Sequence, residues 1–384
     1  MTAGVPLAWL LLIKLRGRFI AAVAGIAFAV ILALVELGFQ EALYASITQL
    51  YSCFNADLVL ISPSYQCMVA RETFPERRLY QSLGVRQVNS VAPVYMDTLQ
   101  WTNPLSRSDR FILVVGFKPA RGTMDLPGVD AQVAKLTEPG RVLFDEASRS
   151  EFGPIARLCR ERGAVVTELA RRRIEVVGLF RLGANFANSG HVITSDLNFL
   201  RMAPFRQSGR IDIGLIRLKP GSDALAAREE LSAMLPGDVA VLTKTAFLER
   251  ERSYWSSNLP IGFIFRASLL MSLVVGAVVV YQILYSGVSE HLAEYATLKA
   301  IGYSDRRLFW VVMQEALILS ILGFIPGLLL GLGVYSVVRV FTFIPIQMTV
   351  VRAIAAYALT GTMCAAAGAL AMGRLRSADP ADVF

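Results

Sequence analysis

Long apolar runs alternate with polar segments along this chain, and their lengths predict four membrane-spanning helices. A span needs about 20 predominantly apolar residues. Runs of at least that length occupy residues 19–39, 261–287, 308–338 and 353–373. Between the first two runs lie more than 200 residues without another run of this kind. The pattern therefore predicts a helical membrane part with one large insertion.

The segment before the first apolar run is amphipathic. Residues 1–18 are rich in leucine and carry Lys14, Arg16 and Arg18, which predicts a helix lying in the membrane interface. A secretory signal peptide has a shorter apolar core and a small-residue cleavage site. Because the run at 19–39 is longer than such a core, we expect a retained membrane anchor.

The insertion, residues 40–260, has the pattern of a folded α+β domain. Two stretches, Glu76–Leu83 and Asp223–Leu235, have apolar residues at helical spacing. At roughly 200 residues the segment is large enough for a hydrophobic core of its own. Short β-type runs bounded by turn residues predict strands at Asp57–Ser62, Phe111–Gly116, Arg173–Phe180, His191–Thr194, Arg210–Leu218 and Val239–Thr243.

Basic residues near the span ends predict the topology. Lysine and arginine are enriched in short loops on the cytoplasmic side. The expectation is that both termini, the loop at 288–307 and the tail at 374–384 are cytoplasmic. The large domain and a short connector at 339–352 then lie outside. The residues on which this depends are Lys14, Arg16 and Arg18, then Lys299, Arg306 and Arg307, then Arg374 and Arg376.

The polar loop between the second and third runs predicts a short, tightly capped helix. Glu290 and Glu294 are four residues apart and share one helix face. Gly302 can adopt the left-handed conformation that ends a helix, and Ser304 is placed to cap the next one. Small residues cover much of the remaining surface, so a partner could approach closely at the membrane surface.

This loop also carries a family resemblance. The residues EYATLKAIGYSDRRL, the later Glu315 with its Gly/Pro-rich run, and the Asp-Pro-Ala-Asp ending resemble the MacB/FtsX family of ABC-transporter permeases. The form HLAEYATLKAIGY is most similar to the DevC branch, known from cyanobacterial glycolipid export. The resemblance implies that the loop is the coupling helix that contacts an ATPase subunit, through Glu290, Glu294, Ala296, Thr297, Lys299, Ala300 and Gly302.

The resemblance implies an assembly and a mechanism as well. The chain would be a homodimeric permease in the bacterial inner membrane, with residues 40–260 as its periplasmic domain and a variable insertion at about 100–210. A separate ABC ATP-binding subunit, a periplasmic adaptor (membrane fusion protein) and a TolC-like outer-membrane channel would complete an exporter. ATP-driven movement of the coupling helix would move the outer domain, which is mechanotransmission, and an amphipathic cargo such as a glycolipid would be exported.

The third apolar run contains polar and helix-bending residues. Glu315 lies about two turns inside it, and an intramembrane carboxylate is by default functional or paired. We interpret it as a structural tie to a neighbouring helix, with proton or substrate chemistry as the alternative. Gly323 and Gly327 allow a neighbouring helix to approach closely, and Pro326 should kink the helix.

The composition is typical of a membrane protein, and the sequence limits the functions that we expect of this chain. The chain is 54% hydrophobic and 18% charged, with a mean hydropathy of +0.51. Its net charge of +8 is not concentrated in long basic blocks, so nucleic-acid binding is not expected. The chain has no GxxxxGK[ST] phosphate loop. We therefore expect no cofactor in this chain and ATP in the partner subunit.

The four cysteines lack the paired CxxC spacing of a zinc site, and we expect no metal. Cys53 and Cys67 could close a disulfide if their segment is extracytoplasmic. The alternative is that both are free thiols.

Two other functions stay open on the sequence. Within the family, the chain could be a lipoprotein-releasing or cell-wall-hydrolase-regulating permease. In another class, it could be a membrane-anchored enzyme that uses His191, Asp145 and Glu146 in the large domain. The adjacent carboxylates at 145 and 146 point to different sides of a helix, so a solvated helix start is the expectation for them.

Overall fold

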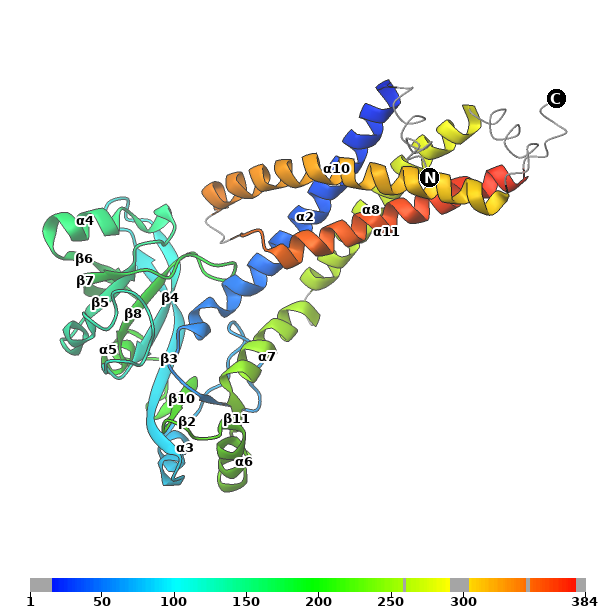
Figure 1. The fold of residues 1–384 in the computed structure, drawn as a ribbon. Helices are drawn as coiled ribbons and strands as arrows, with labels where there is room; N and C mark the ends of the chain where they lie inside the picture. The colour runs from blue at the N-terminus through cyan, green and yellow to red at the C-terminus, as the bar shows by residue number, and fades with distance from the viewer. Residues whose placement is uncertain (1–15, 258–259, 291–303, 343–345, 378–384) are drawn as a thin grey trace. The chain divides into compact units, whose positions relative to one another are not determined.

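The computed structural model describes residues 16–257, 260–290, 304–342 and 346–377. The chain separates into two compact units. One comprises Met1–Ala42 with Ile261–Phe384, and the other comprises Leu43–Pro260. Figure 1 shows the long helices of the first unit and the sheet of the second.

The first unit is built from long helices. In order these are α2 (Arg16–Ser52), α8 (Pro260–Glu290), α10 (Asp305–Thr342) and α11 (Val350–Ser377). Each contains a segment long and apolar enough to cross a membrane, at Phe19–Ser52, Gly262–Ser286, Phe309–Arg339 and Val350–Met372. The predicted fold class, four such helices with a large α/β domain between the first and second, is confirmed.

The first helix is longer than the sequence prediction. Its apolar run was expected to end at Phe39, but α2 continues to Ser52. Residues 40–52 contain no glycine or proline that would stop a helix. Their apolar members Leu43, Ile47 and Leu50 are buried, so tertiary packing supports the additional turns.

Glycines on α10 permit close packing against α2. A Cβ added at Gly323 would lie 2.5 Å from Ile26 Cγ2, and one at Gly327 would lie 2.7 Å from Val30 Cβ. These two glycines are four residues apart and share one helix face, so the backbones approach along a glycine-lined groove. The close packing expected for this stretch is present, and α10 continues through Pro326.

The second unit contains a nine-stranded sheet whose strands follow the order β11-β1-β10-β3-β4-β8-β5-β7-β6. The last strand also pairs with β3, so β3, β4, β8, β5, β7 and β6 form a closed ring. The strands are β1 (Leu58–Ile61), β3 (Val88–Thr102), β4 (Asp109–Phe117), β5 (Arg141–Asp145), β6 (Val165–Leu169), β7 (Arg172–Phe180), β8 (His191–Ser195), β10 (Ile213–Leu218) and β11 (Ala240–Thr243).

The long strand β3 joins the two ends of this unit. Its first half pairs with β10 and its second half pairs with β4, so the ring and the remaining strands lie at opposite ends of β3 (Figure 1). Strands β2 (Phe74–Pro75) and β9 (Arg210–Ile211) form a small separate sheet. The helices are α3 (Glu76–Gln81), α4 (Ile155–Arg162), α5 (Asp196–Met202), α6 (Ala224–Met234) and α7 (Lys244–Ser257).

Both faces of the sheet are covered near β1. All four residues of β1 are buried, with Leu58 and Leu60 in one hydrophobic cluster and Val59 and Ile61 in another. The second cluster also contains Tyr51 from the end of α2 and Phe247 from α7. The segments that enter and leave the domain therefore pack into the same core.

Candidate functional site

The predicted coupling residues are almost all outside the described residues. Glu290 is the last residue of α8, and its side chain is not described. The remaining predicted contacts with an ATPase subunit, Glu294, Ala296, Thr297, Lys299, Ala300 and Gly302, lie in the segment that the structure does not describe. Their role stays a prediction.

Glu315 is buried in α10, with 8% of its surface exposed. Within the described part of the chain, its carboxyl group makes no hydrogen bond or ion pair. The tie to a neighbouring helix that the sequence suggested stays a prediction.

The large domain contains a buried polar chain that sequence reasoning did not find. The Tyr51 and Tyr65 hydroxyl oxygens are 2.8 Å apart, and the Tyr65 hydroxyl donates to Glu251 Oε1. A hydroxyl has one proton to donate, so Tyr51 must donate to Tyr65. We call these three residues the tyrosine–glutamate chain; it links the end of α2, the loop after β1 and α7.

Aromatic packing holds the tyrosine–glutamate chain in place. The Phe247 ring lies 4.9 Å from the Tyr51 ring and 5.6 Å from the Tyr65 ring, centroid to centroid. Such tilted pairs add about 0.5–1.5 kcal/mol beyond their buried area. Because Phe247 and Glu251 are one turn apart on α7, the same helix face supplies both the apolar contact and the acceptor.

The Glu251 carboxylate is fully buried. Burial raises its pKa, and the hydrogen bonds from Tyr65 and from the Met68 backbone N–H offset this only in part. Burial also raises the pKa of Tyr65 well above its usual value, as do Tyr51 and Glu251. The Tyr65 hydroxyl therefore remains a donor at neutral pH.

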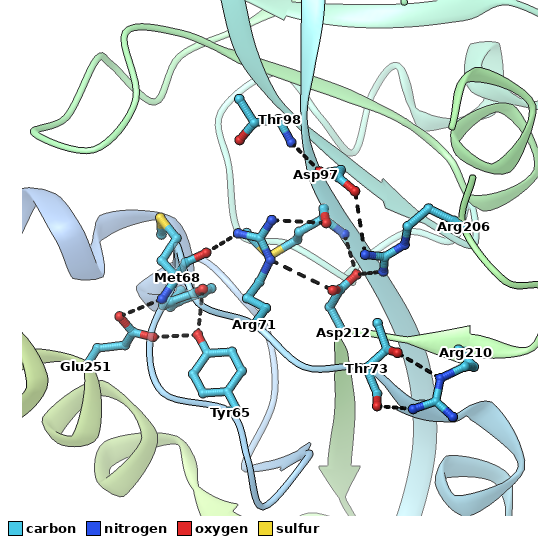
Figure 2. Close-up of polar contacts among 12 residues, drawn as sticks. Tyr65, Met68, Arg71, Thr73, Asp97, Thr98, Arg206, Arg210, Asp212 and Glu251 are labelled. Carbon is cyan, nitrogen blue, oxygen red and sulfur yellow. Dashed lines mark hydrogen bonds and ion pairs between the residues drawn. The ribbon is translucent and has the colours of Figure 1, made fainter. Parts of the chain in front are cut away.

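The peptide groups of Met68 connect the tyrosine–glutamate chain to a second polar group. The Met68 N–H donates to Glu251 Oε2 at 3.2 Å, and the Met68 carbonyl accepts from Arg71. Arg71 also donates to the Met96 carbonyl on β3 at 3.2 Å. Figure 2 shows these contacts running from Tyr65 and Glu251 through Met68 to Arg71.

Arg71 leads to a buried aspartate between β9 and β10. Asp212 Oδ1 lies 3.8 Å from Arg71 Nε, and Asp212 Oδ2 accepts from the Met96 N–H at 2.9 Å and from Arg206. Arg206 also pairs with Asp97 on β3 at 3.5 Å (Figure 2). We call Arg71, Asp97, Arg206 and Asp212 the arginine–aspartate network.

Together the two groups make a continuous polar connection inside the domain. It starts at the end of α2, passes through the loop at 62–71, includes α7, and ends on β3 and the start of β10. Removing one partner from such a buried group leaves another unpaired, which is strongly unfavourable. The arrangement suits a rigid mechanical link, because relative movement of its elements would break buried hydrogen bonds.

The spacing of α7 contains a signal that could have revealed Glu251. Phe247, Glu251 and Trp255 are each four residues apart and all three are buried. A carboxylate between two aromatic residues on one helix face indicates a buried acceptor that needs donors from elsewhere. The sequence does not show that Tyr65, 186 positions away, is that donor.

The expectation of a solvated helix start at Asp145 is wrong. Asp145 is the last residue of β5 and has no exposed surface. Its carboxylate accepts from the backbone N–H groups of Leu182 and Gly183 at 3.1 and 2.8 Å. It also contacts His191 Nδ1 at 3.2 Å. The backbone at 182–183 and His191 on β8 enclose the Asp145 carboxylate, which the local sequence did not reveal.

The Asp145–His191 pair anchors a loop and is closed to solvent. Burial acts to raise the pKa of Asp145, but the hydrogen bond and charge of His191 and the two N–H groups outweigh it, so the pKa lies below its usual value. His191 Nε2 in turn lies 3.3 Å from Asn185 Nδ2. Glu146 points elsewhere and pairs with Arg160. The pair therefore lacks the exposure that substrate chemistry requires.

The cysteines are free thiols in the structure. Cys67 is fully buried, and the Cys53 thiol donates to the Gln49 carbonyl at 3.3 Å. The disulfide between Cys53 and Cys67 therefore stays a prediction. Within the described residues, no group of three His, Cys, Asp or Glu side chains could hold a metal ion.

The C-terminal part of the chain is similar to a known protein family. Residues 266–380 match the family model described as FtsX-like permease C-terminal. No curated protein matches this chain. The matched stretch takes in most of α8 and all of α10 and α11, so the similarity to an FtsX-like permease concerns the membrane unit.

Two solved structures are similar to the large domain. The periplasmic region of MacB from Actinobacillus actinomycetemcomitans is 10% identical with a TM-score of 0.38, over 52% of this chain and 94% of that one. The extracellular domain of the noncanonic ABC-type transporter YknZ from Gram-positive bacteria is 14% identical with a TM-score of 0.35, over 49% of this chain and 100% of that one.

Proposed function

We propose that this chain is the permease subunit of an ABC-type exporter that works by mechanotransmission. The match of residues 266–380 to the FtsX-like permease model supports the permease class. Permeases of the MacB/FtsX type work with an ABC ATPase subunit, and the loop at 288–307 is our candidate for its contact. ATP would be hydrolysed in that subunit.

The observation that carries the mechanical part of the proposal is the tyrosine–glutamate chain. Helix α2 runs without interruption from Arg16 to Ser52, so its apolar stretch and Tyr51 belong to the same helix. Helix α7, which holds Glu251, ends three positions before α8 begins. Movement of either membrane helix would therefore reach the domain where Tyr51, Tyr65 and Glu251 are hydrogen-bonded.

The sequence form HLAEYATLKAIGY supports a finer assignment. By its resemblance to the DevC branch, we propose an inner-membrane homodimer with both termini in the cytoplasm. A periplasmic adaptor and a TolC-like outer-membrane channel would receive the cargo. The cargo would be amphipathic, with a glycolipid as the first candidate from the resemblance, because the four apolar runs contain few polar residues.

The coupling loop provides the test of this function. Ala300→Arg places a long cation on the small-residue surface, and Gly302→Pro removes the residue expected to end the helix. In membranes reconstituted with the ATP-binding subunit, we expect either variant to abolish cargo-stimulated ATP hydrolysis while the thermal unfolding of the permease is unchanged. Normal cargo-stimulated hydrolysis in either variant would falsify the proposal.

A further inference from the structure

A cavity of about 210 Å³ lies on the large domain, where β3, β10 and the turn after β4 meet. Leu215 and Ala92 form an apolar part of its lining. Lys118, Arg121 and Arg217 contribute cationic side chains to the same cavity. No acidic residue is among those that line it.

Strand register explains why these side chains meet. On β10, Leu215 and Arg217 are two residues apart and point to the same face. Their partners on β3 are Ala92 and Ser90, which therefore lie on that face too. The turn that follows Phe117 at the end of β4 brings Lys118 and Arg121 to its edge.

The geometry of the turn at Gly122 orients two of the polar groups. Gly122 has a positive φ of 76°, and a Cβ built there would lie 3.8 Å from Arg217 Nη1 and 3.9 Å from Asn55 Nδ2. The guanidinium of Arg217 and the amide of Asn55 thus converge over this turn. Asn55 is itself fixed by its N–H, which donates to the Thr123 carbonyl at 3.1 Å.

The three cations around the cavity have no carboxylate partner among the described residues. Elsewhere in the domain, arginines such as Arg78, Arg141 and Arg206 form ion pairs. Asp130 is near the turn, but it accepts a hydrogen bond from the Gly122 N–H at 3.0 Å. Three unpaired cations around one concave site create a positive potential that favours an anion.

We propose that this cavity binds the phosphate group of an anionic ligand. Arginine and lysine are the side chains that recognise phosphate. Whole drug-sized ligands occupy about 300–1,000 Å³, so the cavity suits a head group better than a complete large molecule. The apolar wall beside the cations would accept the glycerol or first methylene groups of a lipid. This inference is independent of the transport function proposed above.

Titration of the full-length chain in a neutral detergent, at constant ionic strength, tests the site. The probes are inorganic phosphate, dihexanoyl phosphatidic acid and the uncharged dihexanoylglycerol. We expect saturable binding of a phosphate-bearing probe and none of dihexanoylglycerol. Binding of both phosphate probes with similar affinity identifies a free phosphate site, and binding of phosphatidic acid alone identifies a lipid head-group site.

Two matched double variants distinguish the effect of the cavity cations from the effect of the overall charge of the protein. Arg121→Gln with Arg217→Gln removes two cavity cations, and we expect binding weaker by about tenfold for each cation removed. Arg172→Gln with Arg173→Gln removes the same charge from exposed positions at the start of β7 and should change binding less than about twofold. The proposal is overturned if neither phosphate probe binds saturably, if both double variants lose affinity equally, or if dihexanoylglycerol binds as tightly as phosphatidic acid.

Discussion

The ring end of the large domain and its α2–α7 end each contain a fully buried carboxylate, and the two are stabilised differently. Asp145 accepts from backbone N–H groups and pairs with His191, and its pKa is lowered although burial opposes this. Glu251 accepts from a tyrosine hydroxyl and one N–H, and burial raises its pKa. The hydrogen bonds from His191 and two backbone N–H groups thus outweigh burial at Asp145, whereas the neutral donors at Glu251 offset burial only in part.

The largest loss of stability is expected for substitution of Asp145, at the ring end of the domain. Asp145→Ala leaves His191 and the N–H groups of Leu182 and Gly183 without their acceptor. Breaking a buried pair typically costs about 3–5 kcal/mol, so we expect a loss of that size in the free energy of unfolding. Urea unfolding of the detergent-solubilised protein measures it. A loss under about 1 kcal/mol would contradict the anchor role.

The second-largest loss of stability is expected for substitutions of Glu251. Glu251→Ala leaves the Tyr65 hydroxyl and the Met68 N–H unpaired, and we expect a loss of about 1–3 kcal/mol. Glu251→Gln keeps an acceptor and removes the buried charge, so it should cost less than the alanine variant. The same urea experiment compares the two. Equal losses would show that the packing volume, and not the hydrogen bonds, is what Glu251 supplies.

A smaller effect is expected at the start of the tyrosine–glutamate chain. Tyr51→Phe removes one hydroxyl and its hydrogen bond to Tyr65, while the ring contact with Phe247 is kept. We expect a loss of about 0.5–1.5 kcal/mol in the free energy of unfolding. Tyr80→Phe, at an exposed tyrosine, is the matched control and should change little. Equal effects of the two variants would argue against a buried link at Tyr51.

The contributions of the two carboxylates to stability should depend on pH in opposite directions. The folded-state pKa of Glu251 is raised. At pH values above the usual carboxylate pKa of about 4, the folded protein therefore binds more protons than the unfolded chain does. Its contribution to stability therefore falls as the pH rises through the folded pKa. The pKa of Asp145 is lowered, so its contribution is present above about 4 and is lost as the pH falls through its folded pKa.

Melting curves between neutral and acidic pH measure this difference. Asp212, whose pKa is also raised by burial against the opposing arginines, acts in the same direction as Glu251. The gain in stability on mild acidification should be smaller in Glu251→Gln than in the native protein. An unchanged pH profile in that variant would mean that Glu251 does not titrate in this range.

Regular patterns made part of the fold predictable. The four apolar runs gave the membrane helices because length and hydropathy act locally. Strand β3 was missed because Pro93 and Asp97 interrupt its alternation. In the structure Pro93 lies opposite Gly214, and the side chain of Asp97 pairs with Arg206. The partners of Pro93 and Asp97 therefore lie more than 100 positions away in the sequence.

The candidate site was less predictable than the fold. Tyr65 and Glu251 are far apart in sequence, and the predicted strands contain no information on which loop faces α7. Asp145 was misassigned because its N–H donors come from positions 182 and 183. Long-range pairing of this kind depends on the strand order of the sheet, which periodicity does not determine.

Tyr65→Phe tests the mechanical link most directly, because it removes both hydrogen bonds of the tyrosine–glutamate chain and keeps the ring. The measurement is the amount of the proposed amphipathic cargo exported per ATP hydrolysed, in membranes reconstituted with the ATP-binding subunit and with Tyr80→Phe as control. We predict that the ATP-binding subunit still hydrolyses ATP beside the Tyr65→Phe permease, but that export per ATP is much lower than with the native protein or the control. Export per ATP equal to that of the native protein would contradict the account.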